Sequence, residues 1–284
     1  MKLTANQTTL DPPRPLLNST KLAIMSGESK THEHENCNIH GQGRIKNHSH
    51  DHTHDHGHHH DHHHHHGCKA EMMGQDKFDS EEVALAWTTD PLVVFLNNSL
   101  HKAIFERFDQ NFDPAATTVL DFGCGTGLLT KSLEGKVKQV VGVDVSKAMI
   151  KVYNQRGYDN AVGVCEDVVE PFPAQLEGRK FDFIISCYAL HHVPDPSRRV
   201  QILATYLKPG GHLLFGEFEP SKNSPREFFA QGELAEWMKA AGLRNVQEAV
   251  VFQCKPEDLP ESNVAKKGEM FTSVILAEGK MIEK

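Results

Sequence analysis

Apolar residues recur with helical spacing shortly after residue 90. Five of them lie four positions apart: Leu92, Leu96, Leu100, Ile104 and Phe108. This spacing predicts one buried face of a helix that begins at Asp90, with Pro91 in its first turn. A shorter helix is predicted before it, over residues 79–88, because Asp79 and Glu82 resemble a capping box. Two helices therefore precede the rest of the predicted fold.

Further along the chain, short β-branched runs alternate with helical stretches. The runs predict strands over residues 117–121, 138–144, 161–165, 181–186 and 212–218. The stretches between them predict helices near residues 127–133, 146–155 and 195–207. Ser146 and Asp195 are typical N-caps, and the Lys-Pro-Gly-Gly segment at 208–211 ends the last helix. Strand, helix and strand repeated in this order require parallel pairing with right-handed crossovers, which predicts a doubly wound α/β sheet.

A different pattern follows in the last third of the chain. One helix is predicted over residues 226–241, ending at Gly242, and two strands follow over residues 246–253 and 270–277. Because no helix separates them, these two strands should be antiparallel neighbours. The predicted fold is therefore α/β: a doubly wound, mostly parallel seven-stranded sheet with a C-terminal antiparallel hairpin.

Composition changes at about residue 70. Of the 20 histidines, 16 lie between His32 and His66, in a segment with few large apolar residues. Such a segment cannot bury enough surface to offset the conformational entropy that it would lose on folding. Residues 1–70 are therefore predicted to form a disordered His-rich tail, and residues 71–284 to form one folded domain.

Charge and cysteine usage narrow the partners and the compartment. With 30 Lys and Arg against 38 Asp and Glu, the net charge of −8 gives no general attraction to nucleic acid or anionic lipid. No apolar run approaches the roughly 18 residues of a membrane-spanning helix. The six cysteines form no C-x-x-C pair. We expect a cytoplasmic or nuclear protein with reduced thiols, no nucleic-acid partner and no membrane span.

The strongest local signal is the segment 119–129, in which a predicted strand ends at Asp121 and glycines turn the chain into a helix. These glycines are Gly123, Gly125 and Gly127. They would let the backbone lie close to a ligand at the carboxyl edge of the sheet. A dinucleotide fingerprint would need its third glycine at position 128, which is Leu128. Because Asp121 would repel a pyrophosphate and attract an ammonium or a sulfonium, the pattern favours a cationic ligand.

A second carboxylate, Asp144, ends the next predicted strand 23 positions after Asp121. An acidic side chain at this place can accept hydrogen bonds from both hydroxyls of a ribose. A ribose and a positive group together describe S-adenosylmethionine.

Five motifs occur in the order and spacing of the class I S-adenosylmethionine-dependent methyltransferases: residues 119–129, 142–146, 166–167, 181–186 with 190–193, and 207–211. The chain looks most like the branch that contains quinone-biosynthesis and other small-molecule methyltransferases, and the resemblance spans about residues 78–284. It implies methyl transfer from S-adenosylmethionine to a small molecule. Motifs typical of amide, base and arginine methylation are missing, which also favours a small-molecule acceptor.

The resemblance implies roles for individual residues at the methionine end of the cofactor. Gly123, Gly125 and Gly127 would cradle the methionine moiety, and Asp121 would help to hold its ammonium group. Ser186, after the fourth strand, would contact the same end.

At the nucleoside end, the resemblance implies that Asp144 binds the ribose and that Asp167 accepts a hydrogen bond from the adenine amino group. Phe78 and Trp87, with the first helices, resemble the N-terminal lid of the family.

Two adjacent histidines, His191 and His192, are candidates for a general base near the methyl acceptor. The alternative is that they only shape the loop after the fourth strand, and the sequence leaves both interpretations open. Glu217 and Glu219 follow the fifth strand, where a solvated strand end is the favoured interpretation. Cys124, inside the glycine loop, is interpreted as a packing residue.

The histidine tract between His48 and His66, with aspartates interleaved, offers metal ligands at high local density. Weak Zn²⁺, Ni²⁺ or Cu²⁺ sites are therefore predicted in the tail, at His58, His59, His60, His62, His63 and His64. No metal site is predicted in the folded domain. The alternative function is thus a metal-buffering protein whose cofactor-binding domain serves as a scaffold.

Overall fold

The computed structural model describes residues 78–171, 173, 175–176, 178–219, 228–254 and 273–282. The predicted His-rich tail, residues 1–70, lies outside the described residues, together with the metal sites predicted in it. The features below all belong to the predicted folded domain.

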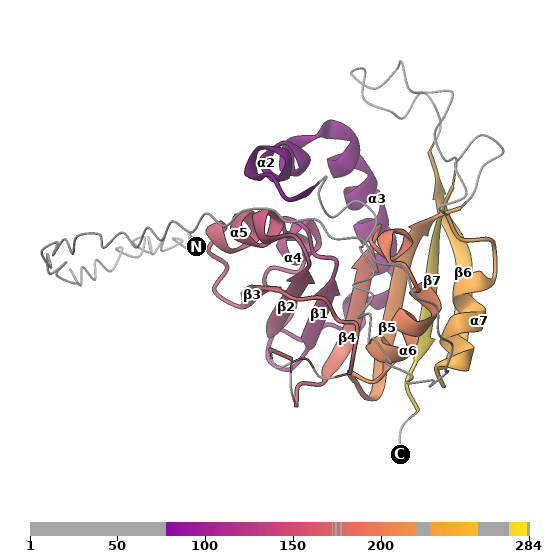
Figure 1. The fold of residues 1–284 in the computed structure, drawn as a ribbon. Coiled ribbons are helices and arrows are strands. Elements are labelled where there is room, and N and C mark those ends of the chain that lie inside the picture. The colour runs from indigo at the N-terminus through magenta and orange to yellow at the C-terminus, as the bar shows by residue number, and fades with distance from the viewer. Residues whose placement is uncertain are drawn as a thin grey trace, which may run out of the picture. The chain divides into compact units, whose positions relative to one another are not determined.

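Seven strands form one mixed sheet in the order β3-β2-β1-β4-β5-β7-β6 (Figure 1). Their bounds are β1 Thr118–Phe122, β2 Gln139–Asp144, β3 Ala161–Cys165, β4 Phe181–Cys187, β5 Leu207–Phe218, β6 Arg244–Gln253 and β7 Ser273–Lys280. Strands β1 to β5 are parallel, whereas β7 is antiparallel to both β5 and β6. The predicted doubly wound sheet with a C-terminal antiparallel pair is therefore confirmed.

The α-helices begin where the sequence provides caps. Their bounds are α2 Glu81–Thr89, α3 Pro91–Phe108, α4 Leu128–Ser132, α5 Lys147–Gln155, α6 Pro196–Ala204 and α7 Glu233–Ala240, and short 3₁₀ helices lie at η1 Asp109–Asn111 and η2 Leu190–His192. The carboxylate of Asp90 accepts hydrogen bonds at the start of α3, and Ser146 and Asp195 cap α5 and α6 in the same way. The predicted caps at Ser146 and Asp195 are confirmed, and Asp90, the predicted start of this helix, is its N-cap.

Three boundaries differ from the prediction. Helix α2 is capped by Ser80, whose hydroxyl accepts from the Val83 N–H, so the predicted Asp79 cap is wrong. Helix α7 begins only after Gly232, because that glycine adopts a left-handed conformation with φ of 88°. The predicted stop at residues 208–211 is the irregular start of β5, where the pairing with β4 shifts register.

The core occupies both faces of the sheet, since consecutive strand residues point to opposite sides. Val119 packs with the apolar face of α3 and with α4, whereas Leu120 packs with α6 and α7. All of the predicted α3 stripe except Leu92 is buried, and Leu92 is half-buried against the same cluster. Gly216 of β5 lies so close to α3 that an added Cβ would stand 2.2 Å from Leu100. This contact fixes α3 over the carboxyl end of β5.

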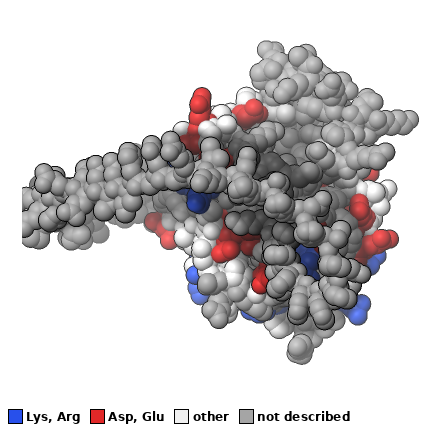
Figure 2. All heavy atoms as spheres, viewed as in Figure 1, with Lys and Arg blue, Asp and Glu red and all other residues white. Residues whose placement is uncertain are grey.

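Charged side chains of both signs share the surface. On the described atoms visible in Figure 2, Lys and Arg are scattered among Asp and Glu. No helix among the described residues is long and apolar enough to cross a membrane. The absence of a nucleic-acid partner stays a prediction.

Candidate active site

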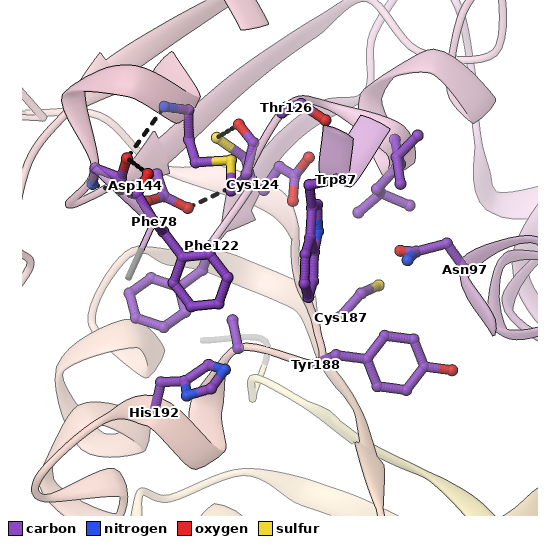
Figure 3. A pocket seen from close by; sticks show the side chains of 18 of the residues that line it. Phe78, Trp87, Asn97, Phe122, Cys124, Thr126, Asp144, Cys187, Tyr188 and His192 are labelled. Atoms are coloured by element: carbon purple, nitrogen blue, oxygen red, sulfur yellow. Dashed lines mark hydrogen bonds between the residues drawn. The ribbon is translucent and has the colours of Figure 1, made fainter. Parts of the chain in front are cut away.

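A pocket of about 420 Å³ lies at the carboxyl ends of the central parallel strands. Its walls come from the ends of β1, β2, β4 and β5, from the glycine loop, and from α2 and α3 (Figure 3). Ligands of open α/β sheets bind at this edge, where the strand order reverses. The sheet topology therefore places this pocket where the sequence predicted a cofactor.

The three glycines of the loop all adopt left-handed conformations, with φ of 69° at Gly123, 50° at Gly125 and 85° at Gly127. An added Cβ at Gly123 would stand 2.2 Å from Ala189, and one at Gly127 would stand 2.8 Å from the ring of Tyr153. At Gly125 no atom lies within 4 Å of that position. Gly125 therefore offers open space beside its backbone, whereas Gly127 serves close packing and lies outside the pocket lining.

Asp144 ties the end of β2 to the glycine loop. Its Oδ2 accepts from the Gly125 N–H at 2.9 Å, and its Oδ1 accepts from the Ser146 N–H at 2.9 Å. Burial raises the pKa of this carboxyl above its usual value, although the backbone hydrogen bonds oppose the shift. The carboxylate keeps acceptor capacity for a ligand, because two oxygens offer about four acceptor sites.

Asp121 is buried at the end of β1 and also lines the pocket. The Thr130 hydroxyl donates to its Oδ2 at 2.9 Å, and the Tyr153 hydroxyl lies 2.9 Å from Thr130 Oγ1. Burial raises the pKa of Asp121 to about 7, and the nearby Asp144 adds to the rise. A cationic group beside Asp121 would favour its charged form.

The loop also contains a buried hydroxyl that no motif in the sequence indicates. Thr126 Oγ1 is inaccessible to solvent and has no hydrogen-bond partner among the described residues. Thr126 lines the pocket between Gly125 and α4. The open side of Gly125 and the Asp121 carboxylate fit a ligand that carries an amino group, as the methionine part of S-adenosylmethionine does.

Besides Gly127, two predicted cofactor residues, Asp167 and Ser186, are absent from the pocket lining. The carboxylate of Asp167 accepts from Arg199 Nη1 at 2.9 Å, and Glu166 and Arg199 line the pocket in its place. Ser186 is fully buried in β4, and its hydroxyl has no partner among the described residues. Neither the Asp167 nor the Ser186 side chain contacts the pocket in this arrangement. The ion pair of Asp167 with Arg199 could not be predicted from the sequence, because 32 positions separate the two residues.

His191 and Glu217 form a buried pair at the ends of β4 and β5. His191 Nδ1 lies 2.7 Å from Glu217 Oε2, and Glu217 Oε1 accepts from the Leu190 N–H at 2.7 Å. Glu217 is fully buried, so its interpretation as a solvated strand end is wrong. The loop after β4 covers the end of β5, which no local pattern around Glu217 could indicate. His191 itself lines the pocket.

The N-terminal segment covers the pocket beside these histidines. The rings of Phe78 and Trp87 meet edge to face with centroids 5.2 Å apart, and Phe78 meets His192 at 5.8 Å. The Ser146 hydroxyl donates to the Phe78 carbonyl at 2.7 Å, which connects this segment to the cap of α5. All four residues line the pocket, and the role of Phe78 and Trp87 as a lid stays a prediction.

A comparison with protein-family models decides the family, because the model of a methyltransferase domain matches residues 96–248, more than half of the chain. The chain belongs to the class I S-adenosylmethionine-dependent methyltransferases. The resemblance found in the sequence motifs is thereby confirmed, and S-adenosylmethionine is the methyl donor.

Curated relatives of this methyltransferase include enzymes of ubiquinone biosynthesis. The ubiquinone biosynthesis O-methyltransferase of Xanthomonas axonopodis pv. citri (strain 306) is 29% identical over 170 residues, which cover 52% of this chain and 71% of that protein. The enzyme of the same name from Ralstonia nicotianae is 30% identical over 155 residues, covering 47% of this chain and 65% of that protein. These relatives place the methyltransferase in a small-molecule branch.

Solved structures share the fold of this methyltransferase at low sequence identity. Phosphoethanolamine N-methyltransferase 2 of Haemonchus contortus matches with a TM-score of 0.56 and 16% identity, covering 74% of this chain and 59% of that one. N-methyltransferase NodS of Bradyrhizobium japonicum matches with a TM-score of 0.54 and 17% identity, covering 75% of this chain and 98% of that one. At this identity the matches establish the fold alone.

Two further sequence interpretations concern the folded domain of the methyltransferase. Cys124 is buried, its Sγ would stand 2.8 Å from an added Cβ at Gly142, and burial raises the pKa of its thiol well above the usual value. These features agree with a packing residue and oppose a nucleophile. No group of three or more His, Cys, Asp or Glu side chains suited to a metal occurs among the described residues.

Proposed function

We propose that this methyltransferase transfers the methyl group of S-adenosylmethionine to a hydroxyl oxygen of a small, largely apolar molecule, with His191 as the general base. The observation that carries the proposal is the pair between His191 and the fully buried Glu217. The names of the curated relatives, which are O-methyltransferases, support oxygen as the acceptor atom. When bound, S-adenosylmethionine supplies a methyl group already activated by its sulfonium.

The cofactor end of the pocket is proposed to lie at the ends of β1 and β2. There, Asp121 would hold the ammonium, Gly123 and Gly125 would allow the methionine to approach the backbone, and Asp144 would bind the ribose. Its oxygens are already oriented by two backbone N–H groups, which favours this role.

Gly127, Ser186 and Asp167, the remaining predicted cofactor residues, do not line the pocket, and we propose indirect roles for them. Gly127 would support the loop through its close packing on Tyr153. Ser186 would act through the backbone at the end of β4, because its side chain is fully buried. Asp167 would reach the adenine amino group only through a rearrangement of its ion pair with Arg199.

The base role of His191 follows from the hydrogen-bonding capacity of Glu217. An ionised carboxylate only accepts hydrogen bonds, so the proton of a neutral His191 ring resides on Nδ1 and points at Glu217. Nε2 then carries the lone pair that can take the proton of an acceptor hydroxyl. The buried carboxylate would stabilise the imidazolium that results, as in other carboxylate-oriented histidine bases. His192 is proposed to shape the wall instead, because its ring packs against Phe78.

The proposal is tested by the position of the transferred label. The full chain is incubated with S-adenosylmethionine labelled in its methyl group and a library of hydroxylated apolar compounds, and labelled products are treated with hydriodic acid. Hot concentrated hydriodic acid cleaves a methyl ether and releases the label as methyl iodide, whereas C-methyl groups, and N-methyl groups at the same temperature, keep it. We expect release of the label. Labelled products that retain it as C-methyl or N-methyl groups would contradict the proposal.

Two variants then test the pair. His191→Asn and Glu217→Gln should each lower the turnover number by about 10²- to 10⁴-fold. Glu219→Gln, two residues further along, serves as the matched control, and it should retain wild-type turnover. Wild-type turnover in folded His191→Asn and Glu217→Gln proteins would show that the pair is not the base.

Neither the tail nor the compartment enters this proposal. Weak divalent-metal binding by residues 1–70, and a cytoplasmic or nuclear location, stay predictions from the sequence.

A further inference from the structure

The end of the pocket away from Asp144 is lined mainly by apolar and aromatic side chains. We call it the acceptor end, and it is formed by Leu92, Val93, Leu96, Asn97, Cys187, Tyr188, His191 and Phe218. The Tyr188 hydroxyl is already engaged, because it donates to the Leu96 carbonyl at 3.1 Å. Apart from the pair of His191 with Glu217, the strong polar group left among these residues is the amide of Asn97.

The orientation of the Asn97 amide is fixed by its hydrogen bond within α3. Its Nδ2 lies 2.9 Å from the Val93 carbonyl. A carbonyl oxygen can only accept, so the NH₂ side of the amide must face Val93. Oδ1 has no partner among the described residues, and Figure 3 shows the amide directed from α3 toward Trp87 and the pocket interior. Asn97 thus presents a free hydrogen-bond acceptor to a ligand in an apolar surrounding.

Tyr188 holds this part of α3 in place. Its backbone lies in the left-handed region with φ of 56°, which is rare for a residue with a bulky side chain. Three contacts maintain this conformation: the hydroxyl bond to Leu96, the N–H bond to the Gly216 carbonyl at 2.9 Å, and stacking on Phe218 at 4.5 Å. Strained residues that persist in this way cluster at functional sites. The residue beside Leu96, Asn97, is consequently held at a fixed position on the wall.

We infer that Asn97 is a specificity-determining residue that accepts a hydrogen bond from a second donor group of the methyl acceptor. The inference rests on the proposed function, since it takes this end of the pocket as the acceptor site. The acceptor would then be a hydroxylated apolar compound with a further hydroxyl or amino group, and not a simple monohydroxy compound. A ligand without that donor would leave Oδ1 unpaired in an apolar environment and would bind less well.

A binding experiment tests this inference without requiring methyl transfer. The full chain, saturated with S-adenosylhomocysteine, is dialysed to equilibrium against 1-naphthol, 2-naphthol and the isomers of dihydroxynaphthalene, whose second hydroxyl scans the possible positions. The fluorescence of the naphthol gives its bound fraction. We expect at least one dihydroxy isomer to bind about three- to tenfold more tightly than either naphthol.

Two variants assign that preference to Asn97. Asn97→Leu should abolish it while binding of the naphthols stays within about twofold. Asn98→Leu is the matched control, because Asn98 is the exposed neighbour on α3, and it should behave as wild type.

Three results would overturn the inference: no preferred isomer, a preference that survives Asn97→Leu, or no binding of any naphthol to protein that binds S-adenosylhomocysteine. Failure of the proposed function is a separate outcome. If His191→Asn did not lower the turnover number, the proposed base would be wrong, but the binding preference for a dihydroxy isomer would be unchanged.

Discussion

The two ends of the pocket are built in different ways. At the cofactor end, Asp121, the glycine loop and Asp144 come from one stretch of 24 residues, and a backbone N–H of the loop donates to Asp144. At the acceptor end, α3 meets the ends of β4 and β5, and Tyr188 bonds to a residue 92 positions away. A site that recognises a constant ligand can be encoded locally, whereas the site that selects the acceptor depends on how distant elements pack.

The two ends also differ in electrostatics. At the cofactor end, burial raises the pKa values of Asp121 and Asp144. A positively charged ligand would favour the ionised form of these carboxyls and would be attracted to it. The acceptor end keeps one buried carboxylate, Glu217, and directs it at His191 and a backbone N–H. We therefore expect changes at one end to affect cofactor affinity and changes at the other to affect acceptor binding and turnover.

The largest expected effect at the cofactor end comes from filling the open space beside Gly125. Gly125→Arg would place a long side chain in the space that is open beside this residue, and would also strain its left-handed backbone. We expect affinity for S-adenosylhomocysteine to fall at least about a hundredfold, or about 2.7 kcal/mol, in titration calorimetry.

The matched control for this change is Gly135→Arg. Gly135 has φ of 70°, and no atom lies within 4 Å of an added Cβ there, but it lies outside the pocket lining. It carries the same backbone strain, so its thermal stability should fall similarly while affinity stays at the wild-type value. Equal loss of affinity in both variants would contradict the placement of the methionine moiety beside Gly125.

A smaller effect should come from pH, through Asp121. Its pKa of about 7 in the protein without ligand means that much of this carboxyl is protonated near neutrality. A bound ammonium stabilises the charged form and lowers that pKa, so binding releases a proton when the pH is below 7. Affinity for S-adenosylhomocysteine should thus rise about tenfold from pH 6 to pH 8 and level off above that.

Asp121→Asn provides the control for the pH effect, since its amide does not titrate. Its affinity should be lower than that of wild type at pH 8 and nearly constant across the range. An unchanged slope in Asp121→Asn would assign the proton to another group, with Asp144 as the next candidate.

Gly216→Ala should disturb the acceptor end and spare the other. An added Cβ at position 216 would stand 2.2 Å from the Leu100 side chain, so either α3 must shift or Leu100 must adopt a less favourable rotamer. We expect a loss of about 1–3 kcal/mol in the free energy of unfolding by urea. Cofactor affinity should stay within about threefold, and in the Gly216→Ala/Leu100→Ala double variant the two costs should be less than additive.

The smallest effect is expected from His192→Ala. His192 contacts the lid residue Phe78 and has no assigned proton-transfer role. Cofactor affinity should stay within about threefold, which is under roughly 1 kcal/mol. A hundredfold loss of turnover with unchanged folding would instead make His192 the base.

What the sequence could predict follows the same division. The strand and helix pattern, the caps at Asp90, Ser146 and Asp195, and the glycine loop depend on neighbours within a few positions. The parallel pairing of the first five strands follows from the alternation of strand and helix together with the rules of right-handed crossover. The doubly wound sheet and the caps at Ser146 and Asp195 were predicted correctly in this way.

Three site features that the sequence missed depend on long-range packing. Glu217 looks like an ordinary polar strand end until the loop after β4 covers it. Asp167 matches the family motif, yet it pairs with Arg199, a residue of α6. Asn97 is one polar position in an amphipathic helix, and only the fold shows that it faces the pocket. No periodicity or motif in this chain carries these facts.

The division between the two ends is tested most directly by calorimetric titration of S-adenosylmethionine and S-adenosylhomocysteine into the wild type, Asp144→Ala and His191→Asn. Asp144→Ala should weaken both ligands about equally, by about 2–4 kcal/mol, and His191→Asn should change neither by more than about threefold. Circular dichroism establishes that each variant is folded. A folded Asp144→Ala protein with wild-type affinity for both ligands would contradict the placement of the cofactor at the ends of β1 and β2.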